Sequence, residues 1–111
     1  MRRALLDVNV LLALLDYDHM CHEAVDEWLV ARGEAGWASC PITQNGFVRI
    51  ASQPAYTGSF STAAAIRRLA TGLADEYHAF WPDDISIADR MTTTLKSCNF
   101  PPFLNFNLYE F

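Results

Sequence analysis

Features that mark several common protein classes are scarce or missing in this sequence of 111 residues. No apolar run reaches the length that spans a bilayer, so we expect no membrane association. The chain has only three cysteines, without metal-type spacing, which argues against a disulfide scaffold and suits the reducing cytoplasm. A glycine-rich phosphate loop and a serine nucleophile elbow are missing as well, which leaves neither a nucleotide-cradling nor a serine-hydrolase motif.

Basic residues are also few. Eight lysines and arginines stand against thirteen acidic residues, and the net charge is −5. This balance argues against nucleic-acid binding through bulk attraction, although it leaves room for a local basic groove. Arg49, Arg67 and Arg68 are candidates for contacts with phosphates or with acidic groups of a partner, and a solvated surface role is the alternative for each.

What the sequence does contain is an alternation of short apolar runs and amphipathic segments. Hydrophobic residues make up 51% of the chain, as in a globular domain. The patterns predict strands and helices in alternation. The strands are expected at 4–6, 36–40 and 78–81. The helices are expected at 8–15, at 22–32, from a Thr43 cap to about 52, from Ser61 or Thr62 with an inward stripe of Ile66, Leu69, Ala70 and Leu73, and after a Ser86–Asp89 capping box.

This order predicts an α/β fold with a mostly parallel central sheet. In such sheets ligands bind at the carboxyl ends of the strands, and Asp7 follows the first strand directly. Its carboxylate oxygens could coordinate Mg²⁺ or Mn²⁺, and Asn9 could orient Asp7 or a bound water. The alternative is that Asp7 only caps the helix that follows it.

Other polar residues are expected near the same edge of the sheet. Thr43 and Gln44 open the helix after the second strand, so Gln44 could face the same cleft as Asp7; a polar first turn capped by Thr43 is the alternative. The pair Asp83–Asp84 follows the third strand, where it could help to bind a metal or form a solvated turn.

The histidine pair His19 and His22 has a spacing that zinc sites use on helices. Further ligands are missing nearby, so a polar helix entry is the better interpretation of this pair.

Four blocks of the sequence resemble, in order and spacing, the PIN-domain ribonuclease toxins of the VapC type. They are ALLDVNVLLALL, HMCHEAVDEWL, CPITQNGFVRIAS and EYHAFWPDDISIAD, and together they cover about residues 1–90. The resemblance implies a PIN-like three-layer α/β/α fold. It also implies a Mg²⁺-dependent endoribonuclease in a toxin–antitoxin pair, with a VapB-type antitoxin as partner and a homodimer as assembly.

The resemblance also assigns roles to single residues. It places the first metal-binding acid at Asp7, and the family often has asparagine at the position of Asn9. The second acid, usually a glutamate, corresponds to Gln44 here, which offers an oxygen but no charge. The third acid belongs to a later TDAYL-like helix, which this sequence lacks, and Asp89 does not match it. The metal site is therefore expected to be short of carboxylates and the activity impaired.

The last residues depart from the family pattern. Residues 99–111 read NFPPFLNFNLYEF, with four of the seven phenylalanines and a Pro-Pro pair. We therefore expect a PIN-like domain over residues 1–98 with an incomplete C-terminal part, followed by an atypical tail at 99–111. A truncated or frame-altered chain and a variant whose final strand lies at 103–109 are both compatible with this composition.

Three functions compete at this point. The first is an endoribonuclease toxin in which Asp7 holds the metal and arginines steady the RNA. The second is a non-catalytic, truncated PIN domain that binds an antitoxin or a second copy of itself. The third is a phosphatase-like enzyme with Asp7 as nucleophile, which ranks last because it needs an Asp-x-Asp pair and residue 9 is asparagine.

Overall fold

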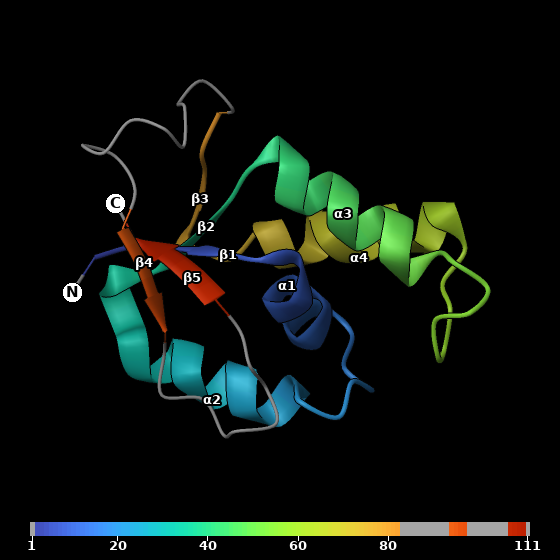
Figure 1. Cartoon of the computed structure of the whole chain (residues 1–111), viewed down its shortest axis with the longest axis horizontal. Helices are drawn as coiled ribbons and strands as arrows, with labels where there is room; N and C mark the ends of the chain where they lie inside the picture. Colours follow the sequence, from blue (N-terminus) through green and yellow to red (C-terminus); the bar gives the residue numbers. More distant parts are fainter. Residues whose placement is uncertain (1, 83–93, 98–106, 111) are drawn as a thin grey trace.

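A mixed sheet surrounded by helices forms the fold in the computed structural model, which describes residues 2–82, 94–97 and 107–110 (Figure 1). The strands of these ranges are β1 (Ala4–Leu6), β2 (Trp37–Ser39), β3 (His78–Phe80), β4 (Thr94–Ser97) and β5 (Asn107–Glu110). The helices are α1 (Val8–Leu15), α2 (His22–Arg32), α3 (Pro41–Ala51) and α4 (Thr62–Leu73), with a 3₁₀ turn at Gly33–Ala35. None of the helices in these ranges combines the length and apolar character needed to cross a bilayer.

The sheet has the order β3-β2-β1-β5-β4. Strand β1 pairs in parallel with β2, which pairs in parallel with β3, whereas β5 runs antiparallel to both β1 and β4. On β2, Trp37 and Ser39 point to one face and Ala38 to the other, and all three are at most 2% exposed. A strand buried on both faces is typical of an α/β sheet, so the predicted fold class is confirmed.

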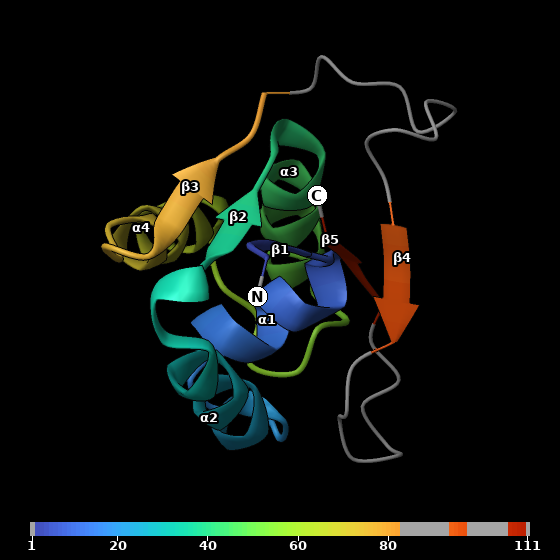
Figure 2. The same ribbon diagram turned by 90° about the vertical axis from the view of Figure 1, so that its left-hand side faces the viewer.

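Helix α1 is the centre of the packing. Val10, Leu11 and Ala13 on this helix are fully buried, and α1 contacts α2, α3 and α4. Both views show α1 between α2 on one side and α3 on the other (Figure 2). Because α1 follows β1 after a single residue, this packing also fixes the position of Asp7 at the end of the strand.

The start of α3 differs from the prediction. Thr43 is not the cap: the helix begins earlier, at Pro41, with Cys40 as the extended N-cap residue. Proline suits the first helical position because its missing N–H would have no partner there. Thr43 lies inside the first turn, is 8% exposed, and accepts a hydrogen bond from the Cys40 N–H at 3.0 Å.

The inward face of α4 matches the prediction only in part. Ser61 caps the helix as expected, since its Oγ accepts a hydrogen bond from the Ala64 N–H at 3.1 Å. Leu69 is buried, but Ile66 is 52% exposed, and Ala65 takes the inward place one turn before Leu69. Ala70 is exposed and Leu73 is only partly buried, so the inward face is narrower than the predicted stripe.

The predictions for the C-terminal part can be compared with the structure only at residues 94–97 and 107–110. Strand β5 lies next to β1 and overlaps the expected strand at 103–109. Asp83–Asp84, the Ser86–Asp89 capping box and most of the tail lie outside the described residues. The domain boundary at residues 98 and 99 stays a prediction.

A close approach between α1 and α3 depends on Gly46. A Cβ atom built on Gly46 would lie 2.5 Å from Cγ2 of Val8, which is closer than carbon atoms pack. The first turn of α1 and the second turn of α3 therefore touch, one residue after Asp7 and two residues after Gln44.

We expect Gly46→Ala to lower the free energy of unfolding by about 1–3 kcal/mol, because the added methyl overpacks the α1–α3 contact. The matched control is Asn45→Ala, an exposed neighbour on the same turn, where alanine should be neutral or stabilising. Urea denaturation of both variants measures the difference. Equal stability of the two would contradict the close approach.

Candidate functional site

The carboxyl ends of β1 and β2 form the edge of the sheet where the candidate residues gather. The two strands are parallel neighbours, with Ala4 opposite Trp37 and Leu5 opposite Ala38. Asp7 follows β1 directly, and Gln44 lies in the first turn of α3, which follows β2. The contact between Val8 and Gly46 holds the starts of α1 and α3 together. The prediction that Asp7 and Gln44 belong to the same edge is therefore consistent with the fold.

Asp7 is the N-cap of α1 and keeps one oxygen available. Its backbone is extended, and its Oδ1 accepts a hydrogen bond from the Val8 N–H at 2.7 Å. Its Oδ2 accepts no hydrogen bond from any residue that the structure describes, and the side chain is partly exposed. Capping and ligand binding do not exclude each other here, because each can use a different oxygen of the same carboxylate.

Asn9 lies on the exposed side of the first turn of α1. Within the described part of the chain, no hydrogen bond joins its side chain to Asp7. Its suggested role in orienting Asp7 directly therefore has no support in this arrangement, and a contact through water stays a prediction.

A chain of hydrogen-bonded polar side chains starts at Gln44 and runs from α3 to β3. Gln44 Nε2 donates to Ser39 Oγ at 2.9 Å, and Ser39 Oγ lies 2.7 Å from His78 Nε2. Ser39 is fully buried on β2, and His78 is partly buried on β3. Sequence reasoning missed Ser39 and His78. The available signal was a serine at the end of a strand that is otherwise apolar.

The surroundings of His78 favour its neutral form. Burial lowers the pKa of His78, and Arg3 acts in the same direction, while the Leu73 carbonyl and Asp75 act against it. The imidazole ring also packs against the indole ring of Trp37, with ring centroids 4.5 Å apart. The chain from Gln44 thus ends on an imidazole that lies against an aromatic ring.

The described residues do not complete a cation site at this edge. No group of three or more His, Cys, Asp or Glu side chains in the described ranges could hold a metal ion. Asp7 alone supplies a carboxylate among the predicted site residues that the structure describes, with Thr43 and Gln44 as neutral neighbours. The arrangement fits one carboxylate ligand of a divalent cation and lacks the further charges that would hold it firmly.

The histidine pair is engaged in local structure rather than in a metal site. His19 Nδ1 accepts a hydrogen bond from the Cys21 N–H at 3.0 Å, and His22 Nδ1 lies 2.8 Å from the Ala13 carbonyl oxygen. The interpretation of these residues as a polar helix entry is therefore consistent with their contacts.

Among the three candidate arginines, Arg68 contacts aromatic rings of its own chain. Its guanidinium lies over the rings of Tyr17 and Phe60, at 4.3 Å and 5.9 Å from their centroids. Arg49 and Arg67 are exposed on α3 and α4 and stay candidates.

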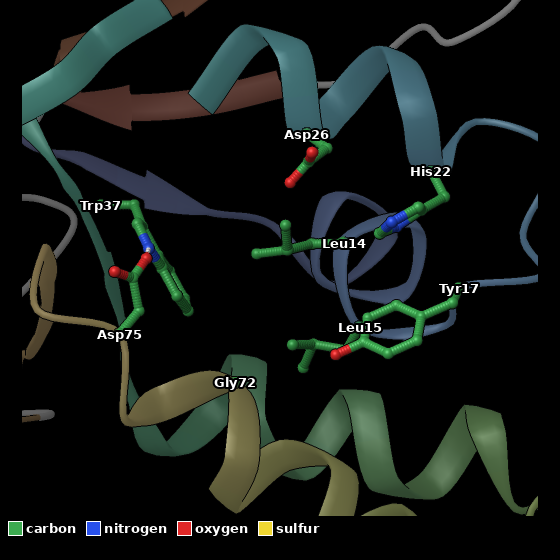
Figure 3. Close-up of a pocket in the computed structure, with 8 residues that line it drawn as sticks. All are labelled: Leu14, Leu15, Tyr17, His22, Asp26, Trp37, Gly72 and Asp75. Carbon is green, nitrogen blue, oxygen red and sulfur yellow. Dashed lines mark hydrogen bonds between the residues drawn. The ribbon is translucent and has the colours of Figure 1, made fainter. Parts of the chain in front are cut away.

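A hollow of about 170 Å³ lies elsewhere, between α1, α2, α4 and the start of β2 (Figure 3). Its walls are formed by Leu14, Leu15, Tyr17, His22, Asp26, Trp37, Gly72 and Asp75. Trp37 Nε1 donates to Asp75 Oδ2 at 2.8 Å, so these two polar groups of the wall satisfy each other. Neither Asp7 nor Gln44 lines it. The edge of the sheet, rather than this hollow, is the candidate functional site.

Comparison with known proteins finds several curated relatives that are named VapC ribonucleases. Ribonuclease VapC44 of Mycobacterium tuberculosis (strain H37Rv) is 58% identical over 87 residues, which are 78% of this chain and 61% of the relative. Ribonuclease VapC38 of the same strain is 42% identical over 87 residues, with 78% and 62% covered, and ribonuclease VapC39 is 44% identical over 85 residues, with 76% and 61% covered. The chain thus spans about three-fifths of the length of these relatives. No protein-family model matches it.

Proposed function

This chain belongs to the family of VapC ribonucleases over the 87 residues that it shares with such relatives, and on this premise we propose that it is an endoribonuclease toxin of low activity. The substrate is RNA, whose phosphodiester bonds are hydrolysed at the edge formed by β1 and β2. The single observation that carries the proposal is Asp7, which follows β1 directly and has one carboxylate oxygen left for a ligand.

We propose Mg²⁺, or Mn²⁺ in its place, as the cofactor, with Asp7 as its charged ligand and Gln44 as a neutral one. Divalent cations promote phosphodiester hydrolysis by activating water and offsetting charge on the phosphate. Among the described residues Asp7 is the one carboxylate of the predicted site, and a cation held by so few charges would support only slow hydrolysis. Thr43 and Asn9 are supporting residues in this proposal.

A second candidate function is a non-catalytic module that binds a VapB-type antitoxin or a second copy of the chain. The shortage of carboxylates among the described residues favours it, and three exposed apolar side chains offer area for a contact. Met20 before α2, Val30 on α2 and Ile42 on α3 are 86%, 74% and 64% exposed. The antitoxin and the homodimer are partners in both candidates. Free Cys21 and Cys40 support a location in the cytoplasm.

The test is RNA cleavage by the purified full chain with Mg²⁺, with and without EDTA. We expect slow cleavage that EDTA abolishes and added Mg²⁺ restores, because the cation supplies the activated water. Cleavage that persists in EDTA would contradict metal dependence. The absence of any cleavage, together with binding of a VapB-type protein in a pull-down, would favour the second candidate.

A further inference from the structure

The hydrogen-bond chain between Gln44, Ser39 and His78 has a defined direction. The nitrogen of the Gln44 amide can only donate, so Ser39 Oγ must accept at the 2.9 Å contact. The single hydroxyl proton of Ser39 is then left for His78 Nε2 at 2.7 Å. Donation runs from α3 through β2 to β3, and Nε2 of His78 must be without a proton.

This direction also decides which nitrogen of the imidazole ring is protonated. Because Nε2 of His78 accepts from Ser39, a neutral ring carries its proton on Nδ1. The Gln44 amide nitrogen thus sets the polarity of both Ser39 and His78.

The polarity also decides which atom Gln44 turns away from the strand. Since Nε2 faces the buried Ser39, the amide oxygen Oε1 points away from it, and it accepts no hydrogen bond from the residues that the structure describes. A reversed amide would instead turn two N–H donors outward, which would disfavour a cation beside Asp7.

We propose that Ser39 and His78 are positioning residues that fix the Gln44 amide with its oxygen outward, toward the edge that Asp7 shares. His78 acts through Ser39 and touches no ligand itself. That a divalent cation would meet the Gln44 oxygen rests on the proposed function. The direction of the hydrogen bonds does not rest on it.

The direct test reads the imidazole protons of the full-length, ¹⁵N-labelled chain by NMR at neutral pH, with the His78 signals assigned through His78→Gln. We expect the wild-type ring to carry its proton on Nδ1. In Gln44→Glu the residue at 44 can only accept, so Ser39 must donate to it and accept from His78, and the proton should appear on Nε2. The matched control, Asn45→Asp, adds the same charge on the exposed next residue and should leave the tautomer unchanged.

Two results would overturn the proposal: a wild-type proton on Nε2, or a Gln44→Glu ring with the wild-type tautomer. Mn²⁺ titration adds a second readout, in which the side-chain amide signal of Gln44 should broaden in the wild type and less in Ser39→Ala. Equal broadening in both would remove the positioning role. Because neither readout needs RNA cleavage, the expected tautomers in a chain that cuts no RNA would remove the proposed function and leave this inference standing.

Discussion

Gly36→Ala is expected to destabilise the fold strongly, with a loss of about 3 kcal/mol or more in the free energy of unfolding. Gly36 enters β2 with φ +70° and ψ −171°, a backbone conformation that residues with a side chain rarely adopt. A Cβ atom there would also lie 2.5 Å from the Tyr77 carbonyl oxygen and 2.7 Å from the Arg3 guanidinium. Strain and overlap therefore act together.

The overlap would act on contacts that join the parallel strands. Arg3 Nη1 donates to the Tyr77 carbonyl at 2.6 Å and to the Trp37 carbonyl at 3.1 Å, which ties the residue before β1 to the start of β2 and to the residue before β3. Displacing Arg3 or Tyr77 would loosen all three strands at once.

Urea denaturation measures this effect, with Gly33→Ala as the matched control. Gly33 has φ +55° but nothing within 4 Å of its would-be Cβ, so alanine there adds strain without overlap. We expect a smaller loss of about 1–2 kcal/mol for the control. If Gly36→Ala and Gly33→Ala were equally stable, the overlap beside β2 would be refuted.

The second large effect is expected at Asp7, where two substitutions separate its two roles. Asparagine is as good an N-cap as aspartate, so Asp7→Asn should keep the stability of α1 while it removes the charge that attracts a cation. Asp7→Ala removes both and should also lose about 1 kcal/mol of unfolding free energy. We expect Mn²⁺ affinity to fall about tenfold or more in both variants, because ligand charge sets the affinity of oxygen sites.

Mn²⁺ titration followed by calorimetry, together with thermal unfolding, checks both parts. Unchanged Mn²⁺ affinity in Asp7→Asn would mean that the carboxylate only caps the helix. Loss of stability in Asp7→Asn equal to that in Asp7→Ala would mean that the charge, and not the cap, holds the start of α1.

The strands β1, β2 and β3 and the helices between them could be predicted well from the sequence, because their sequence patterns are local. The apolar run 4–6 and the helix after Asp7 appear as expected, since a buried strand and a helix packed in the core are apolar on most sides. The Ser61 cap is predictable because it depends on a contact within one turn. The start of α3 was missed because Thr43 and Pro41 both suit a helix start, and the competing contact with Cys40 decides between them.

The candidate site could be predicted less completely because part of it depends on contacts between distant residues. Asp7 could be named from its place after an apolar run. Ser39 and His78 could not, because their contact joins residues on two strands, 39 positions apart in the sequence. The buried face of α4 shows the same limit: periodicity points to Ile66, while the actual neighbours of the helix select Ala65.

The most direct test of a ribonuclease site at Asp7 is cleavage of a labelled RNA by the wild-type chain and by Asp7→Asn, side by side in Mg²⁺. We predict slow cleavage by the wild type and a loss of about 100-fold or more in Asp7→Asn, whose fold and cap are preserved, because only the ligand charge is removed. Equal cleavage by the two proteins would contradict the assignment of the carboxyl edge of β1 as the ribonuclease site.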